Sequence, residues 1–131
     1  MRRIEVGEGI ETWKDIPGYL MLYQASTFGN IKSLNREVLN GDRYRVIKGG
    51  VMSPAKTSKG YLQLSLNKNG KEKKFKVHQL IAMAFLNHVP DGGKTDVDHI
   101  NGIRNDNRLE NLQELSRLEH GRKTHSAEHS K

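Results

Sequence analysis

The strongest constraint on the fold of this chain lies in residues 60–77, where two alternating segments flank an Asn-Gly pair. Apolar and polar residues alternate in YLQLSL (residues 61–66) and again in KKFKV (residues 73–77). Because Asn and Gly both accept positive φ angles, such a pair favours a tight two-residue hairpin turn. The sequence therefore predicts a β-hairpin over residues 60–77 with Asn69 and Gly70 at its tip.

The polar face of this hairpin is expected to be strongly basic. Its five lysines are Lys68, Lys71, Lys73, Lys74 and Lys76. A twisted cationic hairpin can lie against a phosphate backbone or in a DNA groove, and we expect these lysines to contact DNA. The alternative is a solvated edge whose lysines prevent edge-to-edge aggregation.

The overall charge of the chain is also consistent with contact to DNA. The 131 residues include 22 Lys and Arg against 15 Asp and Glu, for a net charge of +7, and the pI is about 9.7. Such an excess favours a polyanion such as nucleic acid as partner, although it also suits a merely soluble basic protein. With 34% hydrophobic residues, we expect one domain or two very small ones, each with a modest core.

Several classes of protein are excluded or disfavoured by what the sequence lacks. It has no cysteine, which excludes disulfides, thiolate zinc sites and Cys nucleophiles and fits a reducing compartment. No apolar run approaches the roughly 18 residues that cross a membrane, and the basic N-terminus lacks the apolar core of a signal peptide. We expect a cytoplasmic protein of a bacterial or phage-infected cell, with no membrane partner and no organic cofactor.

The N-terminal half reads as short strands separated by turns. A turn at Pro17-Gly18 should precede strands over residues 19–25 and 30–34, and residues 35–59 should form short strands or a long hairpin. Large aromatic and aliphatic side chains dominate burial, so a small core is expected in this half. Its predicted members are Trp13, Ile16, Tyr23 and Phe28.

One helix and one further strand pair are expected in the C-terminal half. QLIAMAFL (residues 79–86) has helical spacing of its apolar residues, and His78 at its start is interpreted as a structural histidine. Strands are predicted over residues 95–100 and 112–116, and a helix over residues 117–125. Between the strands lies a loop rich in Asn and Asp.

This strand pair carries residues that could perform chemistry. Asp98 and His99 are adjacent on a predicted strand, so their side chains point to opposite faces unless the strand bends. Asp98 and His120 could together form an open metal site, with His99 as a general base on water. From spacing alone this is a weak constellation. A closed structural zinc site is the alternative, although such sites usually use thiolates.

Three motifs in this region resemble those of a known family. DHING, NDNRLENL and the later EH are similar to the HNH endonuclease motif, whose three letters fall on His99, Asn111 and His120. HQLIAMAFLNH resembles the helix that precedes this motif in phage and intron-encoded HNH enzymes. WKDIPGYLMLYQASTFGNIKSL, with YLQLSL, resembles a nuclease-associated modular DNA-binding motif, so the resemblance covers residues 11–125.

The resemblance implies an α+β fold in two parts. Residues 11–70 would be a β-rich DNA-binding region, and residues 71–125 a ββα-metal (His-Me finger) HNH nuclease module. The implied activity is hydrolysis of phosphodiester bonds in double-stranded DNA, homing-endonuclease-like, with nicking by a monomer; a dimer is the alternative. A rival from another class is a catalytically silent DNA-binding protein that serves as a phage accessory or regulatory factor.

The resemblance also assigns roles to residues. His99 would activate water, Asn111 would hold the catalytic loop that orients it, and Asp98 and His120 would bind one divalent metal ion. Mg²⁺ or Mn²⁺ is expected, with Zn²⁺ or Ni²⁺ as alternatives. The candidate phosphate clamps that flank this site are Arg104, Arg108, Arg122 and Lys123. Solvated surface charge is the alternative role for each of them.

Overall fold

The computed structural model describes residues 9–90 and 95–116, and these form many short strands around one α-helix. The strands in the N-terminal part are β1 (Trp13–Asp15), β2 (Tyr23–Ser26), β3 (Ile31–Ser33), β4 (Arg36–Asn40), β5 (Arg43–Ile47), β6 (Gly50–Val51) and β7 (Ala55–Lys56). They are followed by β8 (Leu62–Lys68), β9 (Lys71–Lys76), the helix α1 (Val77–Phe85), β10 (Thr95–His99), the 3-10 turn η1 (Leu109–Asn111) and β11 (Leu112–Ser116).

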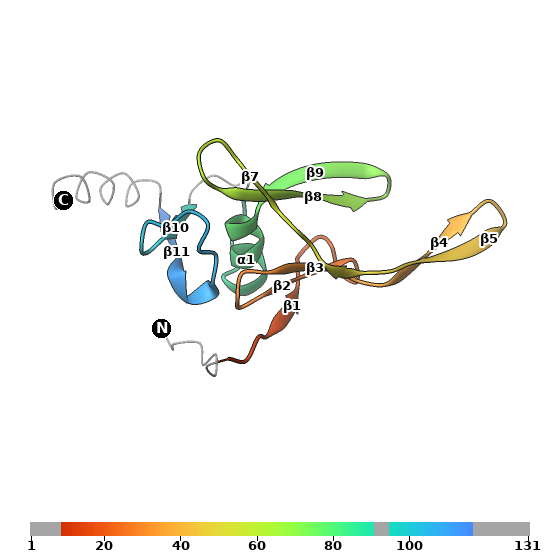
Figure 1. The fold of residues 1–131 in the computed structure, drawn as a ribbon, viewed down its shortest axis with the longest axis horizontal. Coiled ribbons are helices and arrows are strands. Elements are labelled where there is room, and N and C mark those ends of the chain that lie inside the picture. Colours follow the sequence, from red (N-terminus) through yellow and green to blue (C-terminus); the bar gives the residue numbers. More distant parts are fainter. Residues whose placement is uncertain (1–8, 91–94, 117–131) are drawn as a thin grey trace.

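The strands form two small sheets and two separate hairpins, and every strand pair is antiparallel. One sheet has the order β1-β2-β3-β6 and the other β7-β8-β9. Figure 1 shows α1 near the centre, with the β10–β11 hairpin to its left, the β7–β8–β9 sheet above it and β1, β2 and β3 below and to its right, while the β4–β5 hairpin extends away from the body. The expected strand-rich α+β architecture is confirmed; the helix predicted for residues 117–125 lies outside the described residues.

The hairpin predicted around Asn69-Gly70 is present. Both turn residues have positive φ angles, 53° at Asn69 and 75° at Gly70, which is the conformation that a two-residue turn between twisted strands requires. Strands β8 and β9 pair from Gln63 opposite Lys76 to Lys68 opposite Lys71. The prediction of the turn was therefore correct in position.

The prediction that five lysines share one face of this hairpin was wrong. Lys73 pairs with Leu66 and Lys68 with Lys71, so these three lysines lie on the face that carries the buried Leu64, Leu66 and Phe75. Lys74 and Lys76 lie on the opposite face, across from Ser65 and Gln63. Side chains directly opposite each other in an antiparallel pair share a face. The face that carries the core residues therefore carries Lys68, Lys71 and Lys73 near the tip of the hairpin.

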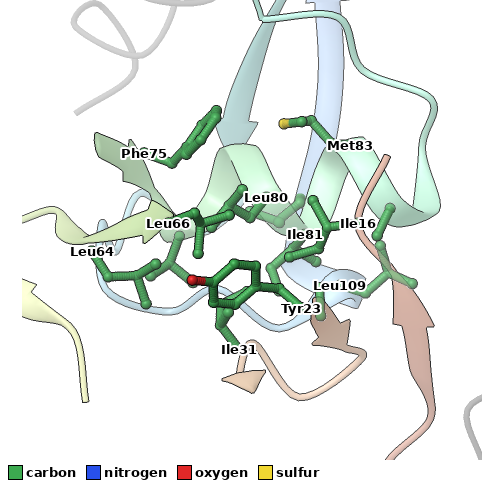
Figure 2. Packing of buried hydrophobic residues seen from close by; sticks show 14 residues of the cluster. Ile16, Tyr23, Ile31, Leu64, Leu66, Phe75, Leu80, Ile81, Met83 and Leu109 are labelled. Atoms are coloured by element: carbon green, nitrogen blue, oxygen red, sulfur yellow. The ribbon is translucent and has the colours of Figure 1, made fainter. Parts of the chain in front are cut away.

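The core is built on α1, most of which is buried. Leu80 and Ile81 of α1 pack against side chains from both sheets and from η1, as Figure 2 shows. The backbone N–H of Lys76 donates to Oε1 of Gln79 at the start of the helix, which satisfies one backbone donor there. Other labelled members of this core in Figure 2 are Ile16, Tyr23, Ile31, Leu64, Leu66, Phe75, Met83 and Leu109. One core therefore joins the N-terminal strands to the C-terminal segment.

Two of the four predicted N-terminal core residues are not buried. Ile16 and Tyr23 are in the core, as predicted. Phe28 is 39% exposed, and Trp13 is only half-buried, with the ammonium of Lys32 4.3 Å from its ring centroid. Hydrophobicity alone indicated burial, but Phe28 lies in the turn between β2 and β3, where its ring remains partly in solvent.

This same turn contacts the C-terminal loop directly. The backbone N–H of Leu109 donates to the carbonyl oxygen of Thr27 at 2.9 Å. A Cβ atom added to Gly29 would lie 2.8 Å from the carbonyl carbon and oxygen of Asn107. The β2–β3 turn therefore supports the backbone of residues 107–109 from outside.

We expect Gly29→Ala to lower the free energy of unfolding by about 2–4 kcal/mol. Gly29 has a φ of 91°, which strains an L side chain, and the added methyl group would press on the backbone of Asn107. Gly70→Ala is the matched control, because Gly70 also has positive φ but an added Cβ meets nothing within 4 Å. That control should lose only about 1–2 kcal/mol. Urea denaturation of both variants measures the difference, and equal losses would contradict the close approach to Asn107.

Within the described residues, no helix is long and apolar enough to span a membrane.

Candidate active site

The β10–β11 hairpin presents Asp98 and His99 on opposite faces. Asp98 pairs with Gln113 and His99 with Leu112, and side chains alternate between faces along a strand. Oδ2 of Asp98 accepts a hydrogen bond of 3.0 Å from Nε2 of Gln113. His99, at the end of β10, is buried with 7% exposure. The opposite orientation expected for two neighbours on a strand is thus observed.

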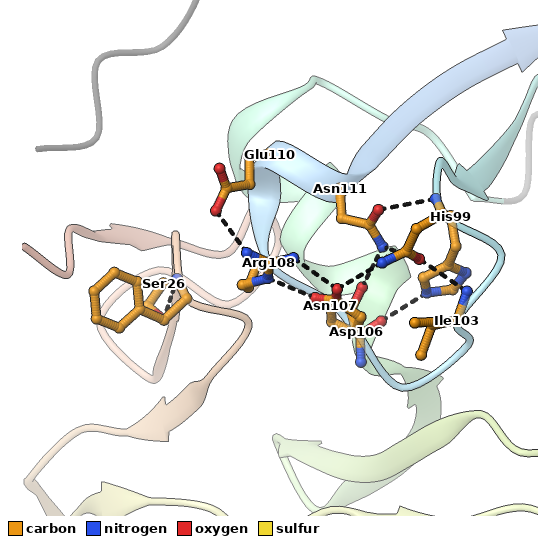
Figure 3. A network of polar contacts seen from close by, with 10 residues as sticks. Ser26, His99, Ile103, Asp106, Asn107, Arg108, Glu110 and Asn111 are labelled. Atoms are coloured by element: carbon orange, nitrogen blue, oxygen red, sulfur yellow. Dashed lines mark hydrogen bonds and ion pairs between the residues drawn. The ribbon is translucent and has the colours of Figure 1, made fainter. Parts of the chain in front are cut away.

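The imidazole of His99 is hydrogen-bonded to Asn107, a residue to which the HNH resemblance assigned no role. Nε2 of His99 lies 2.8 Å from Oδ1 of Asn107, as Figure 3 shows. Because a carbonyl oxygen only accepts hydrogen bonds, this contact requires the proton on Nε2, and in the neutral ring Nδ1 then keeps its lone pair. This arrangement prepares Nδ1 to accept a proton. The Asn that precedes Arg108 in NDNRLENL was visible in the sequence, but its contact with His99 was not.

Asn111 connects the two ends of the loop between β10 and η1. Its Oδ1 accepts from the backbone N–H of Asn101 at 3.0 Å, and its Nδ2 donates to Oδ1 of Asn101 and to the carbonyl oxygen of Asp106. Its own carbonyl oxygen accepts from the N–H of Ile100. The buried side-chain amide of Asn111 therefore joins both ends of the loop that follows His99 (Figure 3).

A charged group closes the same loop. Arg108 donates to both carboxylate oxygens of Asp106 and, through Nη1, to Glu110. Asp106 also accepts from Nδ2 of Asn101. The hydrogen bonds from Arg108 are the main reason that the pKa of Asp106 is lowered to about 2. Because its guanidinium is already bound to two carboxylates, Arg108 is less suited to clamp a phosphate than the sequence suggested.

Arg104 is placed differently. Its Nη1 donates to the carbonyl oxygen of Lys59 at 2.7 Å, and its guanidinium carbon lies 5.0 Å from the centroid of the Tyr61 ring. These two contacts hold a cation beside the aromatic side chains that surround His99. The remaining predicted site residues, His120, Arg122 and Lys123, lie outside the described residues.

Two further rings contact His99. The His78 ring centroid lies 4.7 Å from that of His99 in an edge-to-face arrangement, and the Tyr61 centroid lies 6.2 Å from it. His78 is buried near the start of α1, so the interpretation as a structural histidine is consistent with its position. The sequence did not indicate its contact with His99, since the two residues meet only through packing of the β10–β11 hairpin near α1.

The candidate metal ligands are only partly described. In residues 9–90 and 95–116 no cluster of three or more His, Cys, Asp or Glu side chains could hold a metal ion. Asp98 supplies a carboxylate oriented by Gln113, which suits a hard divalent cation that keeps water or phosphate oxygens as other ligands. Asp98 could therefore serve as one ligand of such a cation.

Burial lowers the pKa of His78 to about 3, with His99, Lys76 and His88 adding electrostatic repulsion of its charged form. The unfolded chain, in which histidine has a pKa near 6.5, then binds more protons than the folded chain between about pH 3 and 6.5. Stability from this group is fully present above pH 6.5 and is lost as the pH falls. We expect His78→Phe to reduce the slope of unfolding free energy against pH in this window by about 1.4 kcal/mol per unit. Urea denaturation at several pH values tests this, and an unchanged slope would contradict it.

Asn107→Ala should lower any activity that uses Nδ1 of His99 by about 10- to 100-fold, because it removes the acceptor that sets the tautomer and ring orientation. Asn107→Asp keeps an acceptor at the same place and should lose less. Initial rates of the two variants and the parent make the comparison. Equal losses in both variants would show that the acceptor at Oδ1 is not what matters.

Comparison with known proteins places this geometry in a family. Residues 11–67 match the model of the NUMOD4 motif, and residues 75–122 match that of an HNH endonuclease. An uncharacterized HNH endonuclease of Acanthamoeba polyphaga mimivirus is 35% identical over 105 residues, which are 79% of this chain and 23% of that protein. The DNA endonuclease I-HmuI of Bacillus phage SP01 is 33% identical over 101 residues, which are 77% of this chain and 50% of that protein.

A solved structure agrees with these sequence matches. The structure, of DNA binding and cleavage by the HNH homing endonuclease I-HmuI, matches this chain with a TM-score of 0.68 at 28% identity. The match covers 88% of this chain and 59% of the I-HmuI chain. The chain thus spans about half or less of the length of the curated relatives above. The two matched models together cover both the strand-rich N-terminal part and the hairpin that carries His99 and Asn111. The chain therefore carries a segment that matches the NUMOD4 motif over residues 11–67 and, after it, a segment that matches an HNH endonuclease over residues 75–122.

Proposed function

We propose that this chain is a divalent-metal-dependent DNA endonuclease that hydrolyses phosphodiester bonds, in the manner of a homing endonuclease, and that a monomer nicks one strand. The observation that carries the proposal is the buried His99, whose Nε2–H is bound by Asn107 while Nδ1 keeps its lone pair. That is the state a general base requires. The similarity to I-HmuI, named as a DNA endonuclease, supports DNA as the substrate.

In the proposed reaction, Nδ1 of His99 accepts a proton from the attacking water. Asn107 then stabilises the imidazolium, because the Nε2–H that it binds becomes a stronger donor. Asn111 keeps the loop closed, so the ring of His99 does not have to be ordered during the reaction. The chain's part in catalysis is therefore to hold one buried proton acceptor in place.

Asp98 and His120 would hold the metal ion. A divalent cation bound there supplies positive charge to the scissile phosphate and its leaving oxygen. Asp98 lies next to His99 in the chain but on the other face of β10, so the base and the metal ligand do not compete for the same space. We expect Mg²⁺ or Mn²⁺ to serve here, with Zn²⁺ or Ni²⁺ as alternatives.

The strand-rich part would hold the DNA. We propose that residues 11–70 form the DNA-binding region and residues 71–125 the nuclease module. Lys74 and Lys76 offer positive charge on one face of the β8–β9 hairpin, and Lys68, Lys71 and Lys73 offer it on the other face near the tip. Arg104, whose guanidinium lies beside Tyr61, is a candidate to bind a phosphate near His99; Arg122 and Lys123 are further candidates.

Incubation with supercoiled plasmid and Mg²⁺ or Mn²⁺, with and without EDTA, tests the proposal. Nicked circles should appear first and linear DNA only later, since one site holds one base. EDTA should stop the reaction, and cleavage that persists in EDTA would remove the metal assignment. Salt-dependent DNA binding with no cleavage under any divalent metal would instead favour the catalytically silent DNA-binding protein.

A further inference from the structure

Three rings from three separate segments meet at His99. Tyr61 precedes β8, His78 is the second residue of α1, and His99 ends β10. The His78 ring centroid lies 5.4 Å from that of Tyr61 and 4.7 Å from that of His99. His78 thus lies between a tyrosine that carries Arg104 on its ring and the histidine that bears the proposed base.

Packing alone does not account for a histidine at position 78. The side chain is buried, and among the described residues its Nδ1 has no hydrogen-bond partner. A buried polar atom without a partner costs about 1–3 kcal/mol. An aliphatic residue would avoid this cost, as Leu80 and Ile81 do on the same helix. A flat ring in contact with His99 is the property that such a residue would lack.

The contact complements the hydrogen bond to Asn107. That bond fixes the position of Nε2 of His99, but a ring held at one atom can still swing about it. The edge-to-face contact with His78 restrains the ring plane, and aromatic pairs in this geometry attract each other by about 0.5–1.5 kcal/mol beyond their buried area. Two restraints at different atoms define the direction in which Nδ1 points.

Charge in the surroundings favours an uncharged ring at this position. The ammonium of Lys76 lies 5.7 Å and the guanidinium carbon of Arg104 5.0 Å from the Tyr61 ring centroid. A charged His78 would add a cation in direct contact with His99. Like charges at this distance in a buried site oppose each other strongly, so a charged neighbour would disfavour the imidazolium that a general base forms.

We propose that His78 is a positioning residue for His99: its buried, uncharged ring, backed by Tyr61, holds the imidazole plane so that Nδ1 faces the attacking water. This inference rests on the proposed function, because it assigns a purpose to the orientation of His99. It extends the site from the HNH segment into α1 and the residue that precedes β8.

His78→Leu and His78→Phe form a matched pair that tests it. Both remove the unpaired Nδ1 and keep the site apolar, so both should fold, but only Phe restores a flat ring. In plasmid nicking we expect His78→Leu to lower kcat by about 10- to 100-fold with KM within about twofold, and His78→Phe to stay within about threefold of the parent. Met83→Ala, an equally buried change in the core on the same helix, should lose stability and leave kcat unchanged.

A second readout does not depend on cleavage. In ¹⁵N-labelled protein, the Nε2–H proton of His99 should give a hydrogen-bonded resonance in the parent and in His78→Phe, and should broaden or exchange faster in His78→Leu. If the parent does not cleave DNA, the proposed function fails while this resonance still reports whether His78 restrains the ring. A parental kcat and an unchanged resonance in His78→Leu would overturn the inference. So would a loss in His78→Phe as large as that in His78→Leu.

Discussion

His99→Ala is expected to lower the rate constant for DNA nicking by about 10²- to 10⁴-fold, the range that a positioned general base contributes. His99 is the buried imidazole whose Nε2–H is bound by Asn107, and alanine leaves no group at that place that can accept the proton of water. DNA affinity should change little, because the substitution leaves the lysines of the β8–β9 hairpin and the proposed DNA-binding region unchanged. Single-turnover nicking of plasmid under excess protein measures the rate constant.

His88→Ala is the matched control for that experiment. His88 is also buried, and its Nδ1 lies 2.7 Å from Oε1 of Glu114, so it too loses one polar contact when truncated. It should cost stability without lowering the nicking rate. Added imidazole should restore part of the rate to His99→Ala and none to the control. A His99→Ala protein that nicks as fast as its parent would show that another group accepts the proton.

Asn111→Ala should lower both stability and activity. The side chain makes three hydrogen bonds within the loop, and its loss leaves the buried N–H and carbonyl partners without it. Leaving buried groups unpaired costs about 1–3 kcal/mol each, so we expect the free energy of unfolding to fall by about 2–4 kcal/mol. Nicking should fall by about 10- to 100-fold at temperatures where the variant is still folded, because the loop that supports His99 opens.

Asn30→Ala is the matched control for Asn111→Ala, because it removes an asparagine side chain that lies outside the loop. The amide of Asn30 donates to Glu11 at an exposed position, and surface changes of this kind alter stability by only about 0.5 kcal/mol. Urea denaturation and single-turnover nicking should leave Asn30→Ala close to the parent. If Asn111→Ala matched it in both measurements, the loop would not depend on this amide.

Some features of the fold followed from the sequence because the interactions that create them are local. The Asn69-Gly70 turn depends on two φ angles that only such residues adopt easily. The helix follows from apolar spacing within nine residues. The strands β10 and β11 were expected as a pair on either side of a loop rich in Asn and Asp, and they pair in the structure. For the turn and the helix, neighbours along the chain carry the whole signal.

Other predictions were wrong because burial depends on what packs nearby. Phe28 is exposed although it is strongly hydrophobic, because its position in the β2–β3 turn, and not its hydrophobicity, decides how much of its ring is covered. The lysines of the β8–β9 hairpin divide between two faces because side chains alternate along a strand, so the adjacent Lys73 and Lys74 lie on opposite faces. That division follows from local alternation, whereas the exposure of Phe28 cannot be read from a window of a few residues.

The candidate site divides in the same way. From the sequence alone, the HNH resemblance named His99 and Asn111 as candidates. Alternation along the predicted strand put Asp98 on the face opposite His99. Both inferences use only spacing along the chain. Only the tertiary structure brought Asn107, His78 and Tyr61 to the ring of His99. They come from a loop, a helix and a strand end, and packing of the β10–β11 hairpin and the β7–β8–β9 sheet near α1 puts them in contact. The candidate general base could thus be named from the sequence, whereas the groups that orient it are brought together only by contacts in the folded core.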